Sequence, residues 1–322
     1  MQPPAGREYE RHWTRRNYDR EFVYAKWQEL REKESDVYTD ESLSKDTLND
    51  DYQQLFVTML LDHVQHVLEC VNNKTQPEPL RLLLLGTAGS GKTRAVQTAL
   101  QEIQRTLAAA GLPFDVDPRE FVRVAAPTGS AAFNLRFHAT TVHRLIHWFT
   151  PPYFKAISDD KVLYELQKQL RNTHLIILDE VSMIGRQMMG RIDSRFEQAK
   201  GYQNQRNESV GGVSCVAVGD PAQCEAMHYQ QIYNTTPHKG TAQEGDKQHV
   251  QLSNRGLEVY SSFNKVIVLT KTHRLTMIEN PRTQTERDFN ARAERFVSVL
   301  RRLRDLEWTC EDYFWSVSYT QQ

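Results

Sequence analysis

The sequence has few cysteines and no long hydrophobic run, and each absence argues against a class of protein. Its four cysteines among 322 residues form no Cys-x-x-Cys pair and have no histidine at zinc-ligand spacing. This argues against a disulfide framework and a zinc site, and favours a reducing intracellular compartment. No apolar run approaches the roughly 20 residues that a membrane-spanning helix needs. We therefore expect a soluble intracellular protein with no membrane partner.

The chain also lacks a net charge of either sign and a targeting signal. It has 40 Lys and Arg residues against 41 Asp and Glu residues, so any binding of nucleic acid must depend on a local groove. The N-terminus has no apolar segment of the kind found in secretory signals, and acidic residues such as Glu8, Glu10 and Asp19 argue against a mitochondrial transit peptide. In a eukaryotic cell we expect the nucleus, with the mitochondrion as the alternative.

A glycine-rich loop follows a short apolar run in the first third of the chain. Residues 82–93 read Leu-Leu-Leu-Leu-Gly-Thr-Ala-Gly-Ser-Gly-Lys-Thr and precede a helical pattern. This is the pattern of a phosphate-binding loop, because the glycines allow backbone N–H groups to surround a polyphosphate. We expect Lys92 to reach the β- and γ-phosphates and Thr93 to bind Mg²⁺. The residues expected to bind the nucleotide are Gly86, Thr87, Ala88, Gly89, Ser90, Gly91, Lys92 and Thr93. An ordinary glycine-rich turn is the alternative.

A second apolar run, at residues 174–178, ends in two adjacent carboxylates. In a phosphate-loop protein the first, Asp179, would hold Mg²⁺, and the second, Glu180, would polarise the attacking water. A paired Asp-Glu at this place favours hydrolysis over binding alone. The alternative is a solvated helix start, where acidic residues are also favoured.

Strand and helix patterns alternate along the chain, which is long enough for two domains or for one large α/β domain with extensions. Apolar runs predict strands at residues 82–85, 121–126, 174–178, 215–218 and 266–269, and helical spacing predicts helices over 52–70, 187–199 and around 289–300. The polar stretch 228–255 is expected to be a loop or insertion. The alternation predicts an α/β fold with a parallel sheet covered by helices on both faces.

Four segments, one of which includes the paired carboxylates, follow the phosphate loop in a fixed order. They read Ala-Pro-Thr-Gly-Ser at 126–130 with Thr-Val-His at 141–143, Leu-Asp-Glu-Val-Ser-Met at 178–183, Val-Gly-Asp-Pro-Ala-Gln at 218–223, and Lys-Thr-His-Arg-Leu at 271–275. In this order they resemble the motifs of RecD and Pif-one-like DNA helicases of superfamily one. Several motifs in sequence are far more specific than any one of them.

The resemblance implies an ATP-dependent DNA helicase that unwinds DNA in the 5′-to-3′ direction, with ATP and Mg²⁺ as cofactors and single-stranded DNA or a tailed duplex as partner. It implies catalytic roles for Lys92, Glu180, Gln223 as γ-phosphate sensor and Arg274 as arginine finger. It places the DNA contacts at Pro127, Thr128, Gly129 and His143. A loop of this composition offers N–H and hydroxyl donors to successive phosphates. The alternatives are a plain turn for Pro127–Gly129, a surface amide for Gln223, a solvated cation for Arg274 and a core histidine for His143.

The resemblance also implies a division into a charged extension at 1–47, a first RecA-like ATPase domain at 48–265 and the start of an incomplete second domain at 266–322. The family's adenine-reading glutamine has two candidates, Gln53 and Gln54, while Tyr52 occupies the expected spacing. Cys-Glu-Ala-Met follows Gln223 where the family commonly has Leu-Pro-Pro. The family's C-terminal DNA and arginine motifs do not occur before Gln322, so we expect a fragment or truncated copy. Rival interpretations are a non-catalytic ATP- and DNA-binding module and a small-molecule kinase.

Overall fold

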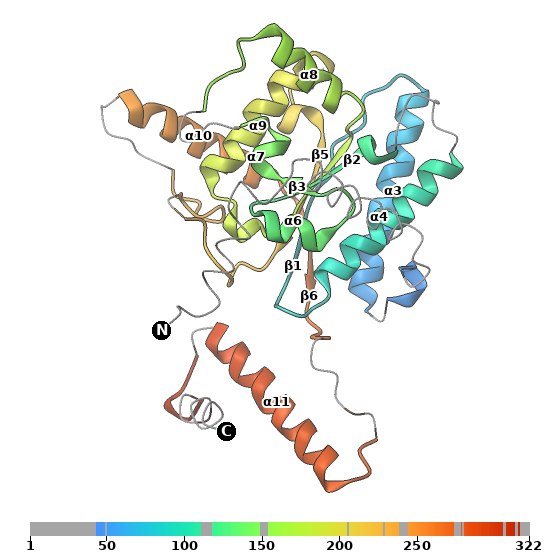
Figure 1. Ribbon diagram of the computed structural model, residues 1–322, viewed down its shortest axis with the longest axis vertical. Helices are drawn as coiled ribbons and strands as arrows, with labels where there is room; N and C mark the ends of the chain where they lie inside the picture. The colour runs from blue at the N-terminus through green and yellow to red at the C-terminus, as the bar shows by residue number, and fades with distance from the viewer. Residues whose placement is uncertain are drawn as a thin grey trace, which may run out of the picture.

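The computed structural model describes residues 43–48, 50–110, 118–148, 154–204, 206–227, 229–237, 244–273, 278, 280–304, 307–312 and 315. A six-stranded sheet lies at the centre of the molecule with helices on both sides (Figure 1). The strands are β1 (Arg81–Gly86), β2 (Val122–Ala126), β3 (Thr140–Thr141), β4 (Leu175–Leu178), β5 (Ser214–Gly219) and β6 (Lys265–Leu269).

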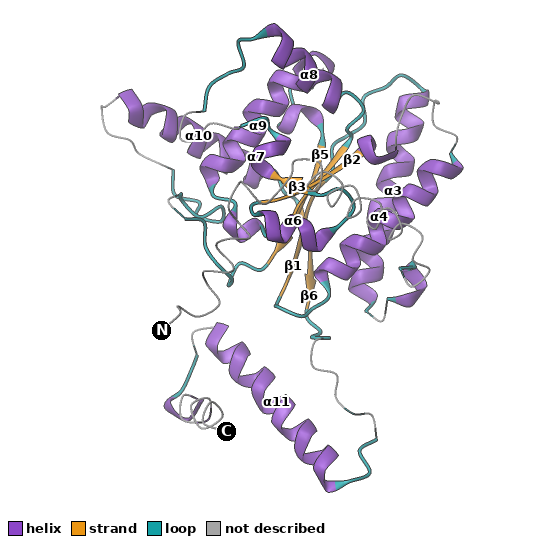
Figure 2. Cartoon of the chain, in the orientation of Figure 1, coloured by secondary structure: helices purple, strands orange, loops and turns teal. Residues whose placement is uncertain are grey.

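The helices alternate with these strands along most of the chain (Figure 2). They are α3 (Asp51–Asn72), α4 (Lys92–Ala109), α5 (Pro118–Phe121), α6 (Gly129–Leu135), α7 (Val142–Leu145), α8 (Asp160–Leu170), α9 (Arg186–Lys200), α10 (Glu244–Ser261) and α11 (Gln284–Arg304). Short 3-10 turns are η2 (Lys45–Thr47), η3 (Val181–Met183), η4 (Gly201–Gln203) and η5 (Val210–Gly212). None of the helices in the described ranges is both long and apolar enough to cross a bilayer.

The sheet is parallel throughout, with the strand order β3-β2-β4-β5-β1-β6. Every residue of β4 and β5 is buried, as expected for central strands that are covered on both faces. One hydrophobic core joins the sheet to α3 and α4, and a second joins its other face to α7, α8 and α9. The predicted α/β fold with a parallel sheet covered by helices on both faces is therefore confirmed.

Helix α3 shows how the amphipathic sequence places one of these layers. The side chain of Asp50 caps the helix by accepting a hydrogen bond of 2.8 Å from the Tyr52 N–H. Phe56, Leu60 and Val64 then lie fully buried on one face, at the spacing of a helical stripe. The helix predicted for residues 52–70 is confirmed.

At both predicted ends of the ATPase domain, neighbouring residues belong to the same fold. Leu43 is buried in the core, so the last part of the predicted extension packs on this fold; residues 1–42 lie outside the described part of the chain. Strand β6 pairs with β1, with Leu82 opposite Lys265 and Gly86 opposite Leu269. The predicted boundary at 265/266 thus falls inside a strand of the first sheet. A second domain after this strand stays a prediction.

Helix α10 corrects the expectation of a loop or insertion over residues 228–255 for its last part, residues 244–255. It packs closely on α9 through two glycines: a Cβ atom on Gly190 would collide with the Leu252 carbonyl, and one on Gly256 with the Arg186 carbonyl. Arg186 is fully buried and donates to the Ser253 carbonyl at 3.2 Å. The polar composition was misleading, because close backbone contact, a buried arginine and only a few apolar residues, Leu252 and Val259 among them, pack this helix on α9 and the second core.

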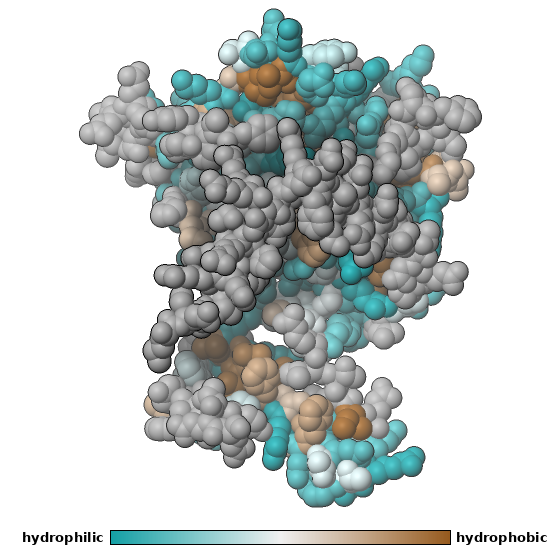
Figure 3. Space-filling view, viewed as in Figure 1, coloured by the Kyte–Doolittle hydropathy of each residue, from teal (hydrophilic) through white to brown (hydrophobic). Residues whose placement is uncertain are grey.

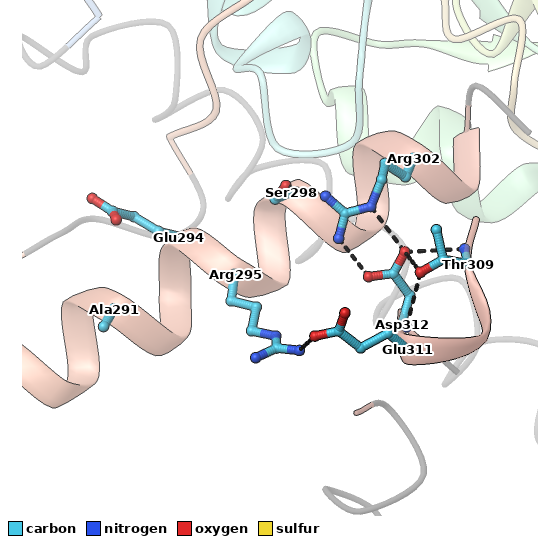
Figure 4. Close-up of a pocket in the computed structure, with 8 residues that line it drawn as sticks. All are labelled: Ala291, Glu294, Arg295, Ser298, Arg302, Thr309, Glu311 and Asp312. Atoms are coloured by element: carbon cyan, nitrogen blue, oxygen red, sulfur yellow. Dashed lines mark hydrogen bonds and ion pairs between the residues drawn. The ribbon is translucent and has the colours of Figure 1, made fainter. Parts of the chain in front are cut away.

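A short segment, residues 307–312, follows helix α11 and packs against it (Figure 4). The Arg302 guanidinium forms a two-pronged ion pair with Asp312, with Nε and Oδ2 2.8 Å apart, and Arg295 lies 2.8 Å from Glu311. The Arg302 partner lowers the pKa of Asp312. Large hydrophobic side chains remain exposed along α11, where Figure 3 shows them on the side facing the viewer.

Candidate nucleotide and DNA site

The predicted phosphate loop connects β1 to α4. Gly89 and Gly91 have φ angles of 81° and 82°, a left-handed backbone conformation that favours glycine. A Cβ atom on Gly91 would also collide with the side-chain nitrogen of Gln53. The structure thus places residues 86–93 as a tight loop at the N-terminus of a helix, the usual position of a bound phosphate.

Lys92 lies across this loop. Its Nζ donates to the carbonyls of Gly86, at 2.7 Å, and Thr87, at 3.1 Å. Burial lowers the pKa of Lys92, while the carboxylates of Asp220, Glu180 and Asp179 act in the opposite direction. The cation therefore faces a cluster of acids without a direct ion pair among the described residues.

Two polar groups of the loop support its fit to a nucleotide. The Ser90 hydroxyl is buried and has no hydrogen-bond partner, and the neighbouring Thr93 is exposed at the start of α4. A buried polar group without a partner is costly. A phosphate with its bound cation would supply partners to both hydroxyls.

The two predicted carboxylates lie at the carboxyl end of β4. Asp179 is 8% exposed, and burial raises its pKa to about 6, with the charge of Glu180 adding to the effect and Lys92 opposing it. Glu180 has φ 51° and ψ 49°, a left-handed conformation that costs a non-glycine residue about 1–3 kcal/mol and clusters at functional sites. A nearby cation would therefore stabilise the ionised form of Asp179, and Glu180 is held in a strained conformation beside it.

These carboxylates fit Mg²⁺ better than a metal held by protein alone. The described residues contain no group of three or more His, Cys, Asp or Glu side chains placed to hold a metal ion. Magnesium usually takes one or two protein oxygens and fills its shell with water and phosphate oxygens. Asp179 and Thr93 provide a donor set of this kind.

The end of β5 completes the acidic side of the site. Asp220 is 4% exposed; its carboxylate accepts from the Ala222 N–H at 3.1 Å, and its carbonyl accepts from the Gln223 N–H at 3.0 Å. The half-buried Gln223 therefore follows a tight turn beside the carboxylates. The predicted arginine finger, Arg274, lies outside the described residues.

Arg304, in the last turn of α11, is a residue of this site that the sequence did not predict. Its Nη2 lies 3.6 Å from Oδ1 of Asp220, and its charge helps to lower the pKa of Lys92. Helix α11 therefore brings a second cation to the carboxylate cluster. Nothing in the sequence distinguishes Arg304 from Arg301 and Arg302 beside it, because the contact depends on how the helix packs.

Of the two glutamines considered for adenine, Gln53 is the one at the phosphate loop. It is buried, and its Nε2 donates to the Ser90 carbonyl at 3.1 Å. Gln54 turns away and donates to the Leu48 carbonyl at 2.7 Å. Near the same loop, the His273 N–H donates to the Gly89 carbonyl at 2.8 Å.

The predicted DNA contacts lie at the carboxyl ends of β2 and β3. The Thr128 hydroxyl caps α6 by accepting from the Ala131 N–H at 3.2 Å, and a Cβ atom on the exposed Gly129 would meet nothing within 4 Å. Pro127 and Thr128 are half-buried. This loop therefore leaves an open backbone segment at the edge of the sheet that holds the carboxylates.

His143 lies in α7, a few residues farther along. Its ring stacks on Trp148 with centroids 4.9 Å apart and planes 14° apart. Burial lowers the pKa of His143, and the Arg191 guanidinium, which lies over the same Trp148 ring, adds to the effect. His143 is thus a half-buried, packed histidine that retains an exposed edge.

Comparisons with known proteins agree with this arrangement. A family description for an AAA domain matches residues 69–245, more than half of the chain. No curated protein matches the sequence. Among solved structures, the Pif1 helicase from Candida albicans matches with 17% identity and a TM-score of 0.50, over 82% of this chain and 46% of that chain.

Two Bacteroides structures match as well. The Pif1 helicase in complex with ADP-AlF3 and ssDNA has 21% identity and a TM-score of 0.43, over 77% of this chain and 47% of that one. Pif1 bound to ssDNA has 21% identity and a TM-score of 0.44, over 79% of this chain and 48% of that chain. The chain spans about half the length of these structures. At the level of the fold, the match to the Candida albicans protein confirms the resemblance read from the motifs.

Proposed function

The chain belongs to the AAA domain family, and from that premise we propose that it is the ATP-hydrolysing part of a Pif1- and RecD-like DNA helicase that unwinds in the 5′-to-3′ direction. One observation carries the proposal. The neighbouring strands β1, β5, β4 and β2 end at the same edge of the sheet, where parallel sheets bind their ligands. The phosphate loop, the carboxylates of Asp179, Glu180 and Asp220, and the Pro-Thr-Gly loop all follow these ends.

In the proposed mechanism the backbone of residues 86–91 holds the phosphates of ATP, and Lys92 exchanges its carbonyl partners for phosphate oxygens. Asp179 and Thr93 would hold Mg²⁺, which when bound would supply positive charge for the phosphates. Glu180 takes a proton from the attacking water. Gln223 orients that water or reads the γ-phosphate, and Arg274 neutralises transition-state charge.

The pairing of β2 with β4 joins the two halves of the site, and its last hydrogen bond involves Asp179. The Asp179 N–H donates to the Ala125 carbonyl at 2.9 Å, so the backbone of the residue that we assign to Mg²⁺ is bonded to the strand that leads into Pro127–Gly129. A shift of Asp179 on binding nucleotide would therefore move the loop that we assign to DNA phosphates. This link gives a short physical route between ATP and DNA.

The proposal is tested by ATP turnover with and without single-stranded DNA. Glu180→Gln keeps the shape of the side chain and the carboxylate of Asp179 but removes the base, so it should bind ATP and lose phosphate release. The wild type should release phosphate faster when single-stranded DNA is added. A wild type without turnover would instead support the non-catalytic ATP- and DNA-binding module.

The DNA loop has its own matched pair of variants. Gly129→Glu places a negative charge where a side chain meets no neighbour, at a helix start that tolerates acids, and Gly129→Ser fills the same space without charge. The glutamate should weaken binding of single-stranded DNA, while the serine should leave it near wild type. Equal DNA affinity in both variants would remove this loop from the DNA path.

A further inference from the structure

A pocket lies at the edge of the sheet opposite the proposed ATP site, where the central strands begin. It has a volume of about 480 Å³ and is formed by the segment after α3, the segment between α8 and β4, the end of α9 and the turn before β5. No residue of the proposed ATP and DNA site lines it. Its size is that of a pocket for a small molecule.

The lining of this pocket is basic. Lys74, Arg171 and Lys200 contribute three cationic side chains, whereas none of the residues lining the pocket is Asp or Glu. The Lys74 and Arg171 side chains are exposed, and Lys200 is 4% exposed. The whole chain carries nearly equal numbers of acids and bases, so this separation of charge is local.

Lys200 is the most informative of these residues. Its Nζ donates to the carbonyls of Arg171, at 3.2 Å, and Thr173, at 2.6 Å, which leaves one of its three N–H donors for another partner. Among the described residues it forms no ion pair. Burial lowers the pKa of Lys200 to about 8, so the side chain is still mainly charged at neutral pH. A buried cation without a carboxylate is costly unless an anion pairs with it.

Two further groups of the lining are an acceptor without a hydrogen-bond partner and a neutral histidine. The buried Oε1 of Gln76 has no hydrogen-bond partner. Burial, with the charge of Lys200 adding to the effect, lowers the pKa of His174 to about 3, so this histidine is neutral. The Gln76 oxygen accepts hydrogen bonds only, so it would take a donor such as the O–H of a singly protonated phosphate, and the neutral histidine adds no charge to the lining.

We propose that this pocket binds a small anion that carries a phosphate group, such as a phosphomonoester. Lys200 would pair with it at the base of the pocket, and Arg171 would provide the planar donors that match phosphate oxygens. Lys74 would contribute charge at the rim. The proposal does not depend on the ATPase mechanism, because the two sites lie at opposite edges of the sheet.

The test uses the full chain with Lys92→Ala, so that the phosphate loop does not compete, in phosphate-free buffer. Inorganic phosphate and phenyl phosphate are added, and binding is followed by calorimetry and by the NMR signals of His174. We expect saturable binding by both methods and a rise in the pKa of His174. Adding Lys200→Met should weaken binding roughly tenfold or more, whereas Lys161→Met, at an exposed lysine of α8, should not.

Arg171→Gln, at an exposed position, repeats the test without touching a buried group, in case Lys200→Met fails to fold. It should weaken the binding of both probes. The proposal is overturned if neither probe shifts His174, or if both bind the Arg171 and Lys200 variants as tightly as the parent. It is also overturned if only a single-stranded oligonucleotide shifts His174, because the pocket would then belong to a nucleic-acid path.

Discussion

Asp179→Asn should make the protein without nucleotide more stable while weakening its binding of Mg·ATP. The wild-type carboxylate is buried, and its pKa is raised from 3.8 to about 6, chiefly by that burial. The folded state therefore holds an ionised group at a cost that the unfolded chain does not bear. Asparagine has nearly the same shape and can accept the same backbone hydrogen bond from Glu180 without the charge.

The size of the effect follows from the two pKa values. A gap of about 2 pH units corresponds to about 3 kcal/mol at roughly 1.4 kcal/mol per unit, and imperfect packing of the amide makes about 1–3 kcal/mol a reasonable expectation. For an acid whose folded-state pKa is raised, the cost is fully present above about pH 6. It declines as the pH falls and is gone below 3.8, the ordinary pKa of the group.

Urea unfolding of wild type and Asp179→Asn at pH 7.5 and pH 5 measures this directly. We expect the variant to be the more stable protein at pH 7.5, and the difference to shrink to about half at pH 5. Asp62→Asn, at an exposed carboxylate of α3, is the control and should show no such trend. If the variant is less stable than wild type at pH 7.5, or if the difference in stability does not change with pH, then the buried Asp179 carboxylate does not destabilise the folded state as described.

Two other substitutions test contacts that the sequence did not reveal. Arg304→Gln should weaken Mg·ATP binding severalfold, by about 1 kcal/mol, because it removes a partly exposed cation beside the phosphates. Arg301→Gln in the same helix should leave the affinity unchanged. If calorimetry finds equal Mg·ATP affinity in the two variants, Arg304 does not belong to the site. Gly190→Ala should lower the free energy of unfolding by roughly 1–3 kcal/mol because it drives α9 from α10. Gly201→Ala, which meets only the Glu197 side chain at 3.8 Å, should be nearly neutral in the same urea titration.

The parts of the site that could be predicted are those in which one short segment contains both the strand end and the chemical groups. The phosphate loop and the Asp179-Glu180 pair are of this kind, since an apolar run followed by a fixed residue order determines where they lie. The parallel sheet followed from the same alternation of runs. These predictions need no knowledge of distant contacts.

The rest depends on packing between segments far apart in the chain. Gln53 and Gln54 are equivalent in sequence, and only the face that α3 turns to the phosphate loop separates them. Helix α10 has a polar sequence, yet Gly190 and Gly256 allow its backbone to touch α9. Arg304 reaches Asp220 only because α11 ends beside β5.

We propose that the loop around Lys92 binds the phosphates of ATP for hydrolysis at the adjacent carboxylates. Calorimetric titration of Mg·ATP into wild type and Lys92→Ala tests it most directly, with Lys161→Ala as a control at an exposed lysine. We predict a steep loss of ATP affinity in Lys92→Ala alone, with an unchanged melting temperature in the absence of nucleotide. Equal ATP affinity in wild type and Lys92→Ala would contradict the assignment of this edge of the sheet as an ATP site.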